Sequence, residues 1–180
     1  MDTITINDHN LKDKDISVTS NKVRAILLSQ NKVLVSNYSG VVLFPGGKID
    51  KGETEEEAII RELQEETGIT YDIKQLDKVF MIKYYQANYP TRNSKTVNRL
   101  MTIKYYLGEY NGINIDEAKR TESEIEGNFK LELVNIDDLL LPSKKSDNPR
   151  KEFFDRENQE VIKALKKLQE KGEINGKNIW

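Results

Sequence analysis

The sequence predicts an α/β fold in which a mixed β-sheet carries helices on its faces. Apolar strand candidates outnumber helical segments, and the helical segments lie between and after the strands. At 180 residues the chain has about the length of one ordinary domain with its own core. We therefore predict a polar N-terminal arm or edge strand at residues 1–20 and a single domain at residues 21–180.

The composition excludes several kinds of site. The chain has no cysteine, so it offers no disulfide, thiolate metal site or cysteine nucleophile. Charged residues make up 32% of the chain, but their formal net charge is −2, which gives no general basic field for nucleic acid. No stretch approaches the roughly 20 apolar residues that span a bilayer. We expect a cytoplasmic protein with no membrane partner.

The domain is predicted to begin with three strands. Val23–Leu28 and Lys32–Val35 are apolar-rich runs separated by three polar residues, which is typical of a hairpin. Val41–Phe44 is a third, short strand that stops at Pro45, because proline cannot donate to a β-ladder. The two glycines that follow permit backbone conformations closed to other residues, so a loop is expected there.

A helix is predicted from about residue 54 to residue 67. Thr54 lies three residues before Glu57, which fits a capping box, and Gly68 supplies a left-handed stop. At 100° per residue, one side of this helix is apolar and should meet the sheet. That side carries Ile59, Ile60 and Leu63.

The second half of the domain carries further strands and a terminal helix. Strands are predicted at Val79–Tyr85 and Leu100–Leu107, around a polar segment, Asn88–Asn98, that we expect to be a long hairpin loop. Leu131–Val134 is another strand candidate, followed by a short helical turn. Apolar residues at helical spacing predict an amphipathic helix at residues 149–171.

Three glutamates fall together beside the apolar side of the first helix: Glu62, Glu65 and Glu66. Like charges three or four residues apart destabilise a helix by roughly 0.2–0.5 kcal/mol per pair, so the cluster opposes folding unless a positive group lies over it. Carboxylate oxygens suit Mg²⁺ or Mn²⁺, and Mg²⁺ usually also binds substrate phosphates. Acidic residues on a helix are also common as solvated surface, and we interpret residues 55–57 in this way.

The residues around this cluster resemble the Nudix box. From Gly47 the chain reads glycine, five residues, Glu53, seven residues, and then REL-x-EE-x-GI, which ends at Ile69. Every defined position of the box is matched, and the order of strand, loop and helix around it is also similar to that family. The resemblance implies a Nudix-type α/β/α sandwich with a mixed β-sheet and a catalytic helix at about residues 54–67.

The resemblance also implies a reaction and a set of roles. Nudix enzymes hydrolyse a nucleoside diphosphate linked to another group X, with Mg²⁺ or Mn²⁺ as cofactor. Arg61 would hold a glutamate four residues on in position, Glu53 would orient the site from its outer shell, and the Gly46 carbonyl would add a metal ligand. The metal-binding glutamates, one of which would take the proton of the attacking water, correspond to Glu62, Glu65 and Glu66.

A further acidic ligand is expected from a later loop. Glu126 is our first choice and Glu124 the second, although an ordinary acidic loop explains either residue equally well. His9, the single histidine, lies in the polar arm without an orienting partner and is left out of the site.

The segments FPGGKIDKGET and RELQEETGIT are similar to Nudix enzymes that cut nucleoside triphosphates to monophosphate and pyrophosphate. We therefore predict a small nucleotide partner, a nucleoside triphosphate that is oxidised or intact. Dinucleoside polyphosphates and, less favoured, the 5′ end of RNA are alternatives. The resemblance implies a lower rank for ADP-ribose, because Nudix members that cut it tend to carry a proline near the position of residues 84–85, where this chain has tyrosines. Candidate substrate-binding residues, some of which could instead be core or solvated surface, are Tyr85, Arg92, Lys95, Arg99 and Lys48.

Two readings outside this activity stay open. One is a non-catalytic Nudix-fold module that binds a nucleotide, against which the intact glutamates argue. The other is the isoprenoid-isomerase branch, against which the lack of cysteine argues. Family habit also favours a homodimer, which the terminal helix could mediate.

Overall fold

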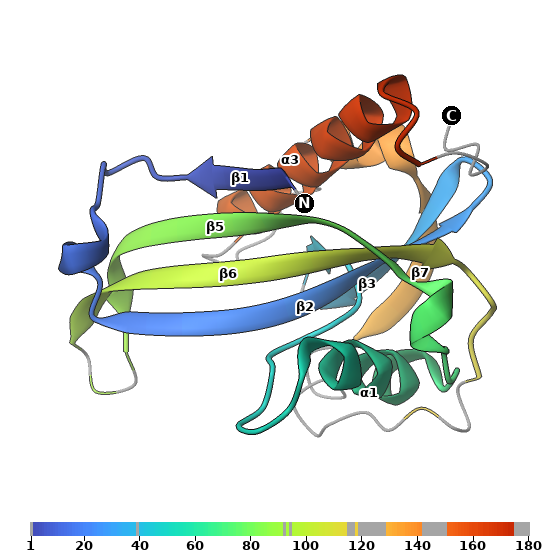
Figure 1. The fold of residues 1–180 in the computed structure, drawn as a ribbon, viewed down its shortest axis with the longest axis horizontal. Coiled ribbons are helices and arrows are strands. Elements are labelled where there is room, and N and C mark those ends of the chain that lie inside the picture. Colours follow the sequence, from blue (N-terminus) through green and yellow to red (C-terminus); the bar gives the residue numbers. More distant parts are fainter. Residues whose placement is uncertain are drawn as a thin grey trace.

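The computed structural model describes residues 2–38, 40–91, 93, 95–114, 118, 129–141 and 151–174. A twisted sheet lies between two helices, with α1 (Glu55–Thr67) against one face and α3 (Lys151–Glu170) against the other (Figure 1). This is the α/β/α layering that the sequence predicts. None of the helices in these ranges is long and apolar enough to cross a bilayer.

The seven-stranded sheet has the order β1-β5-β6-β2-β3-β4, with β7 paired to β3. The β1–β5 and β2–β6 pairs are parallel and the others are antiparallel, so the sheet is mixed, as predicted. Short 3₁₀ turns lie at Asp13–Asp15 (η1), Ile73–Gln75 (η2) and Ile136–Leu140 (η3). The strands are β1 (Asp2–Ile6), β2 (Val18–Ser29), β3 (Lys32–Tyr38), β4 (Val41–Leu43), β5 (Asp77–Pro90), β6 (Thr96–Glu109) and β7 (Lys130–Asn135).

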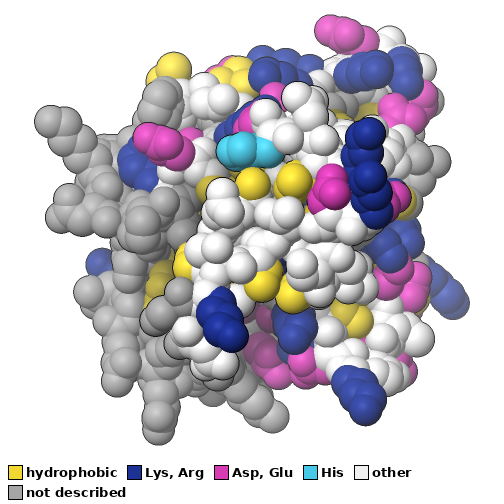
Figure 2. Space-filling model, turned by 90° about the vertical axis from the view of Figure 1, so that its left-hand side faces the viewer, with side chains coloured by type: hydrophobic (Ala, Val, Ile, Leu, Met, Phe, Trp, Pro, Cys, Tyr) yellow, Lys and Arg dark blue, Asp and Glu magenta, His cyan; other side chains and the backbone are white. Residues whose placement is uncertain are grey.

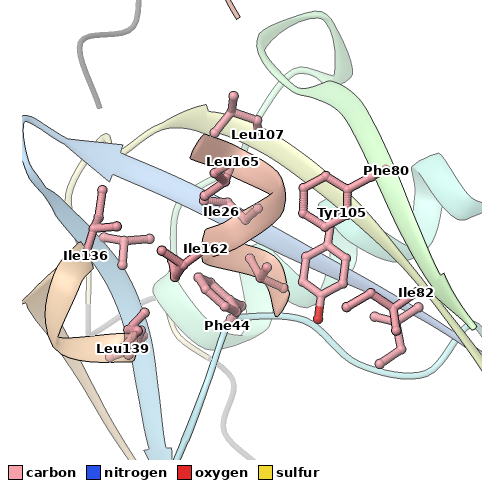
Figure 3. Close-up of a cluster of buried hydrophobic side chains, with 14 of the residues drawn as sticks. Ile26, Phe44, Phe80, Ile82, Tyr105, Leu107, Ile136, Leu139, Ile162 and Leu165 are labelled. Carbon is pink, nitrogen blue, oxygen red and sulfur yellow. The ribbon is translucent and has the colours of Figure 1, made fainter. Parts of the chain in front are cut away.

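Two apolar layers form because successive side chains of a strand point to opposite faces of the sheet. On β2, Val23 and Ala25 pack toward α1, whereas Ile26 packs toward α3. Figure 3 shows the second layer, in which Ile162 and Leu165 of α3 lie over the sheet. β2 contributes side chains to both layers and is thus fixed from both sides.

Helix α1 has the ends that the sequence predicts. The Thr54 hydroxyl accepts a hydrogen bond from the Glu57 amide at 3.2 Å, and the Glu57 carboxylate accepts one from the Thr54 amide at 2.8 Å. Gly68 closes the helix with φ +72°. Glu55, which we interpreted as solvated surface, instead forms ion pairs with Lys78 and Lys104 of the sheet.

The prediction of a long polar loop at Asn88–Asn98 was wrong. β5 continues to Pro90 and β6 begins at Thr96, so the two strands extend into both ends of that segment. A register irregularity between Gln86 and Tyr89 interrupts the pairing, and the ribbon ends are mostly polar and part-exposed. Such a ribbon lacks the alternation of apolar and polar residues by which a half-buried strand is recognised. The polar arm contributes β1, an edge strand parallel to β5.

Thr54→Ala should lower the free energy of unfolding by about 1 kcal/mol, because the Glu57 amide loses its capping partner, the Thr54 hydroxyl. Urea denaturation followed by circular dichroism measures the change. Thr54→Ser, which keeps the capping oxygen, should match the unchanged chain within a few tenths of a kcal/mol. Equal stability of the alanine and serine variants would contradict this account of the helix start.

Candidate active site

The site begins where two neighbouring strands diverge. β2 pairs with β3 only at Leu28↔Val33 and Ser29↔Lys32. Farther from this turn, a segment after β4 takes the place of the strand: the Ala25 amide donates to the Pro45 carbonyl at 2.8 Å, and the Val23 amide donates to the Gly47 carbonyl at 3.0 Å. We call residues 44–48 the glycine loop. Its position is set by the ladder edge of β2.

Both glycines of this loop stand where a side chain would meet a neighbouring group. Gly46 has φ +129°, and a Cβ atom there would lie 2.8 Å from the Cα atom of Arg24. A Cβ atom on Gly47 would lie 2.6 Å from the carboxylate carbon of Glu62. The paired glycines therefore let the loop approach β2 on one side and α1 on the other.

Arg61 binds three of the glutamates of the motif. Its Nε donates to Glu53 Oε1 at 2.7 Å, and its Nη1 donates to Glu62 Oε1 at 3.0 Å and to Glu65 Oε2 at 3.1 Å. Its Nη2 also donates to the Lys48 carbonyl at 3.1 Å. Arg61 thus holds Glu65 in the way we expected, relieves the repulsion within the acidic cluster and ties the cluster to the glycine loop.

The titration of these groups reflects the same contacts. Hydrogen bonds from Arg61 hold the pKa of Glu53 below its ordinary value, aided by the Asp50 amide and opposed by partial burial. The pairing with Glu53, and then with Glu62, raises the pKa of Arg61. The guanidinium and the Glu53 carboxylate therefore both stay charged at neutral pH.

Glu66 lies apart from the Arg61 group. It is 7% exposed, and its Oε2 accepts a hydrogen bond from the Gly46 amide at 3.1 Å. Glu62 and Glu66 lie one helical turn apart and meet consecutive residues of the glycine loop, Gly47 and Gly46. Two carboxylates of the cluster therefore face the loop.

The donor set suits a hard divalent cation, and the missing Cβ atom of Gly47 leaves room at the Glu62 carboxylate. Even so, the described ranges contain no group of three or more Asp, Glu, His or Cys side chains that are close enough to hold a metal ion as they stand. Arg61 explains this, because its guanidinium lies among Glu53, Glu62 and Glu65. The residues fit a cation on the side of the cluster that meets the glycine loop.

A cavity of about 250 Å³ opens beside Glu66 and Gly46. It lies on the α3 side of the gap between β2 and β4, and its walls combine cationic, hydroxyl and aromatic groups. They include Lys22, Arg24, Ser36, Tyr38, Phe129 and Phe154.

Sequence reasoning did not identify these wall residues. One signal was available for Arg24, since a charged residue stands inside the apolar run that predicted β2. The aromatic residues come from distant parts of the chain, and no motif connects them.

The predicted substrate-binding residues do not gather at this cavity. Tyr85 donates a hydrogen bond to Asp13 at 2.8 Å, and Arg99 donates to Gln86 at 2.8 Å, at the hairpin end of β5 and β6. Arg24 is paired with Tyr105 of β6, so Arg99 lies six residues, or about 20 Å, farther along that strand.

The other predicted residues lie as follows. Lys95 also lies at the hairpin end, where its carbonyl accepts a hydrogen bond from the Thr91 amide at 2.8 Å. Lys48 is part of the glycine loop. Arg92, Glu124 and Glu126 lie outside the described residues. Figure 2 shows the hairpin end of the molecule, where charges of both signs are mixed with small groups of hydrophobic side chains.

With this geometry in place, the comparisons identify the family. The model of the NUDIX domain matches residues 16–156, and the chain belongs to the Nudix family. Members of this family generally use divalent metal ions.

Among curated relatives, the 8-oxo-dGTP diphosphatase of Escherichia coli is 74% identical over 27 residues, which cover 15% of this chain and 21% of that protein. The 8-oxo-dGTP diphosphatase of Haemophilus influenzae is 37% identical over 67 residues, covering 37% and 48%. The ADP-ribose pyrophosphatase of Methanocaldococcus jannaschii is 38% identical over 63 residues, covering 32% and 37%. The matches to these three relatives thus span less than half of each relative's length.

Solved structures agree on the fold. The pyrophosphohydrolase BsRppH of Bacillus subtilis superimposes with a TM-score of 0.53 at 21% identity, covering 92% of this chain and 88% of that one. The NUDIX domain of Shewanella oneidensis NrtR, solved with ADP ribose, gives 0.53 at 19% identity, covering 89% and 94%. At these identities the likeness establishes the Nudix fold.

The Glu53–Arg61 pair should make stability depend on pH. Because the pairing lowers the pKa of Glu53 below its ordinary value of 4.5, its contribution is fully present above that pH and is lost as the pH falls through the lowered pKa. A double-mutant cycle with Glu53→Gln and Arg61→Gln should give a coupling energy of about 1 kcal/mol at pH 7 and much less near the acid limit of folding. Urea denaturation at several pH values measures it. A coupling energy that does not change with pH would be inconsistent with an ionic pair.

Proposed function

We propose that the chain is a metal-dependent hydrolase that cuts a nucleoside triphosphate, oxidised or intact, to monophosphate and pyrophosphate. The observation that carries this proposal is the position of Glu66, whose carboxylate accepts a hydrogen bond from the glycine loop and also lines a cavity of about 250 Å³. The relatives named 8-oxo-dGTP diphosphatase support the same class of substrate.

The metal is proposed to bind where α1 meets the glycine loop. Glu62 and Glu66 would hold Mg²⁺ or Mn²⁺ together with the Gly46 carbonyl, and Glu65 and the predicted loop ligand Glu126 would complete the set. A bound divalent cation supplies charge neutralisation for the diphosphate oxygens and a water of lowered pKa. Three carboxylates on one rigid helix keep their ligand oxygens in place before the substrate arrives, which reduces reorganisation during the reaction.

The neighbouring residues prepare these carboxylates for that task. Arg61 fixes Glu62 and Glu65 through hydrogen bonds of 3.0 and 3.1 Å, and Glu53 in turn fixes Arg61 with two hydrogen bonds. One of the helix glutamates takes the proton of the attacking water. Attack at phosphorus needs no covalent nucleophile from the protein, which is consistent with a chain that has no cysteine.

The cavity beside Glu66 is proposed to hold the nucleoside. Phe129 and Phe154 offer rings on which a base can stack, an interaction worth about 1–3 kcal/mol per base. Lys22 adds a cation at the same wall. Because the cavity adjoins the metal-binding carboxylates directly, it favours a compact nucleotide over a dinucleoside polyphosphate or an RNA, which would have to extend toward the hairpin end.

Turnover should depend on the helix carboxylates. With Mg²⁺ or Mn²⁺, Glu65→Gln and Glu66→Gln should each lower kcat by roughly 10²-fold or more, since each loses a charge that positions the cation. Release of pyrophosphate and nucleotide is measured on a panel of nucleoside triphosphates, oxidised ones included, dinucleoside polyphosphates, ADP-sugars and 5′-triphosphorylated RNA.

Glu57→Gln is the matched control, because Glu57 lies on the same helix and serves its cap. It should retain full kcat under conditions where the protein stays folded. Metal binding without turnover of any compound on the panel would favour the non-catalytic nucleotide-binding module instead.

The cavity and the hairpin end make separable predictions about the substrate. Phe154→Ala should raise KM for the preferred nucleoside triphosphate by about tenfold, as expected for the loss of one stacking contact. Tyr85→Ala, at the hairpin end, should leave that KM unchanged. A larger effect of Tyr85→Ala than of Phe154→Ala would support a long substrate that reaches along β5 and β6. Steady-state kinetics with both variants decides between the two.

A further inference from the structure

A charged pair is buried between α3 and the sheet. Arg24 of β2 is 3% exposed and Glu157 of α3 is 1% exposed, and Arg24 Nε lies 2.9 Å from Glu157 Oε1. The Tyr105 hydroxyl donates to the same carboxylate oxygen at 2.6 Å. Burial raises the pKa of Tyr105, and Glu157 raises it further, so the hydroxyl stays protonated and keeps donating.

The same arginine reaches the glycine loop. Arg24 Nη1 donates to the Phe44 carbonyl at 2.6 Å, and the Phe44 ring packs edge-on against Tyr105 beneath α3 (Figure 3). Two residues farther along the loop, the Gly46 amide donates to Glu66. A short chain of contacts thus leads from Glu157 on α3 to the carboxylate of Glu66.

α3 also holds the opposite wall of the cavity. Asn158, the neighbour of Glu157, is buried and donates from Nδ2 to the Val42 carbonyl of β4 at 2.9 Å. Two neighbouring residues of α3, Glu157 and Asn158, therefore bind β2 and β4. The cavity beside Glu66 lies between these two strands.

Stability alone does not account for this pair. Replacing a buried ion pair by well-packed apolar residues is often neutral or stabilising, because both charges must be desolvated. Glu157 Oε2 is also buried with no hydrogen-bond partner among the described residues, which adds to that cost. α3 already has a wide apolar face against the sheet, formed by Val161, Ile162, Leu165 and Leu168.

We infer that Arg24 and Glu157 are positioning residues that fix the glycine loop relative to Glu66. The guanidinium spans the distance between the α3 carboxylate and the Phe44 carbonyl, so the location of α3 determines where the Gly46 amide meets Glu66. The kinetic part of this inference rests on the proposed function, whereas the structural part does not.

The first experiment needs neither substrate nor metal. Arg24→Lys replaces the planar guanidinium by a single ammonium group. The ammonium cannot bind both Glu157 and the Phe44 carbonyl in the same geometry. The Gly46 amide proton, observed by NMR, should shift and exchange with solvent at least tenfold faster. Arg156→Lys is the matched control, because it makes the same change at the more exposed pair with Asp8. An unchanged Gly46 amide in folded Arg24→Lys would overturn the inference.

The second experiment separates positioning from stability. Arg24→Met combined with Glu157→Met replaces the pair by apolar side chains of similar length, and Tm should stay close to that of the unchanged chain. If the pair positions the loop, kcat in this double variant falls at least tenfold although the protein is folded. A kcat equal to that of the unchanged chain at equal Tm would show that the pair only holds α3. Lack of turnover by the unchanged chain would count against the proposed function alone, because the Gly46 amide measurement is independent of it.

Discussion

The whole site depends on the pairing of a loop with the edge of β2. Where β3 diverges from β2, the backbone amides of Val23 and Ala25 would lose their hydrogen-bond partners. The glycine loop supplies carbonyl groups that accept these hydrogen bonds. A side chain at Gly46 would clash with the backbone of β2 and break this arrangement, and one at Gly47 would displace the Glu62 carboxylate. Backbone hydrogen bonding therefore fixes a loop with the accuracy of a strand, and α1 presents its carboxylates to that loop.

Charge repulsion within the acidic cluster opposes folding, and the chain stabilises the individual carboxylates in different ways. Arg61 compensates Glu53, Glu62 and Glu65, whereas Glu66 is buried and accepts a hydrogen bond from the Gly46 amide of the glycine loop. Repulsion within the cluster is thus reduced without being removed. The carboxylates stay close together on one helix, and such a grouping of hard oxygen donors is what a metal-binding role requires.

Local signals predicted the local parts of this molecule. The capping box and Gly68 predicted the bounds of α1, and the spacing from Gly47 to Ile69 predicted the family. The strands at Val79–Tyr85 and Leu100–Leu107 were predicted, but their continuation toward the hairpin end of β5 and β6 was missed, because polar residues on both faces hide the period of a strand. The cavity walls were missed for another reason: Tyr38, Phe129 and Phe154 meet only after the sheet and α3 have packed, and their sequence positions share no period.

The same reasoning explains why the sequence left the role of α3 open. Its apolar stripe predicted a helix and a buried face but no particular location, because such a stripe can pack on any apolar surface. Glu157 and Asn158 interrupt that face with polar groups that need specific partners, and these partners lie on β2 and β4. Apolar packing thus decides that the helix docks, while buried polar groups decide where it docks. In this fold, α3 docks next to the glycine loop, and the glycine loop binds Glu66.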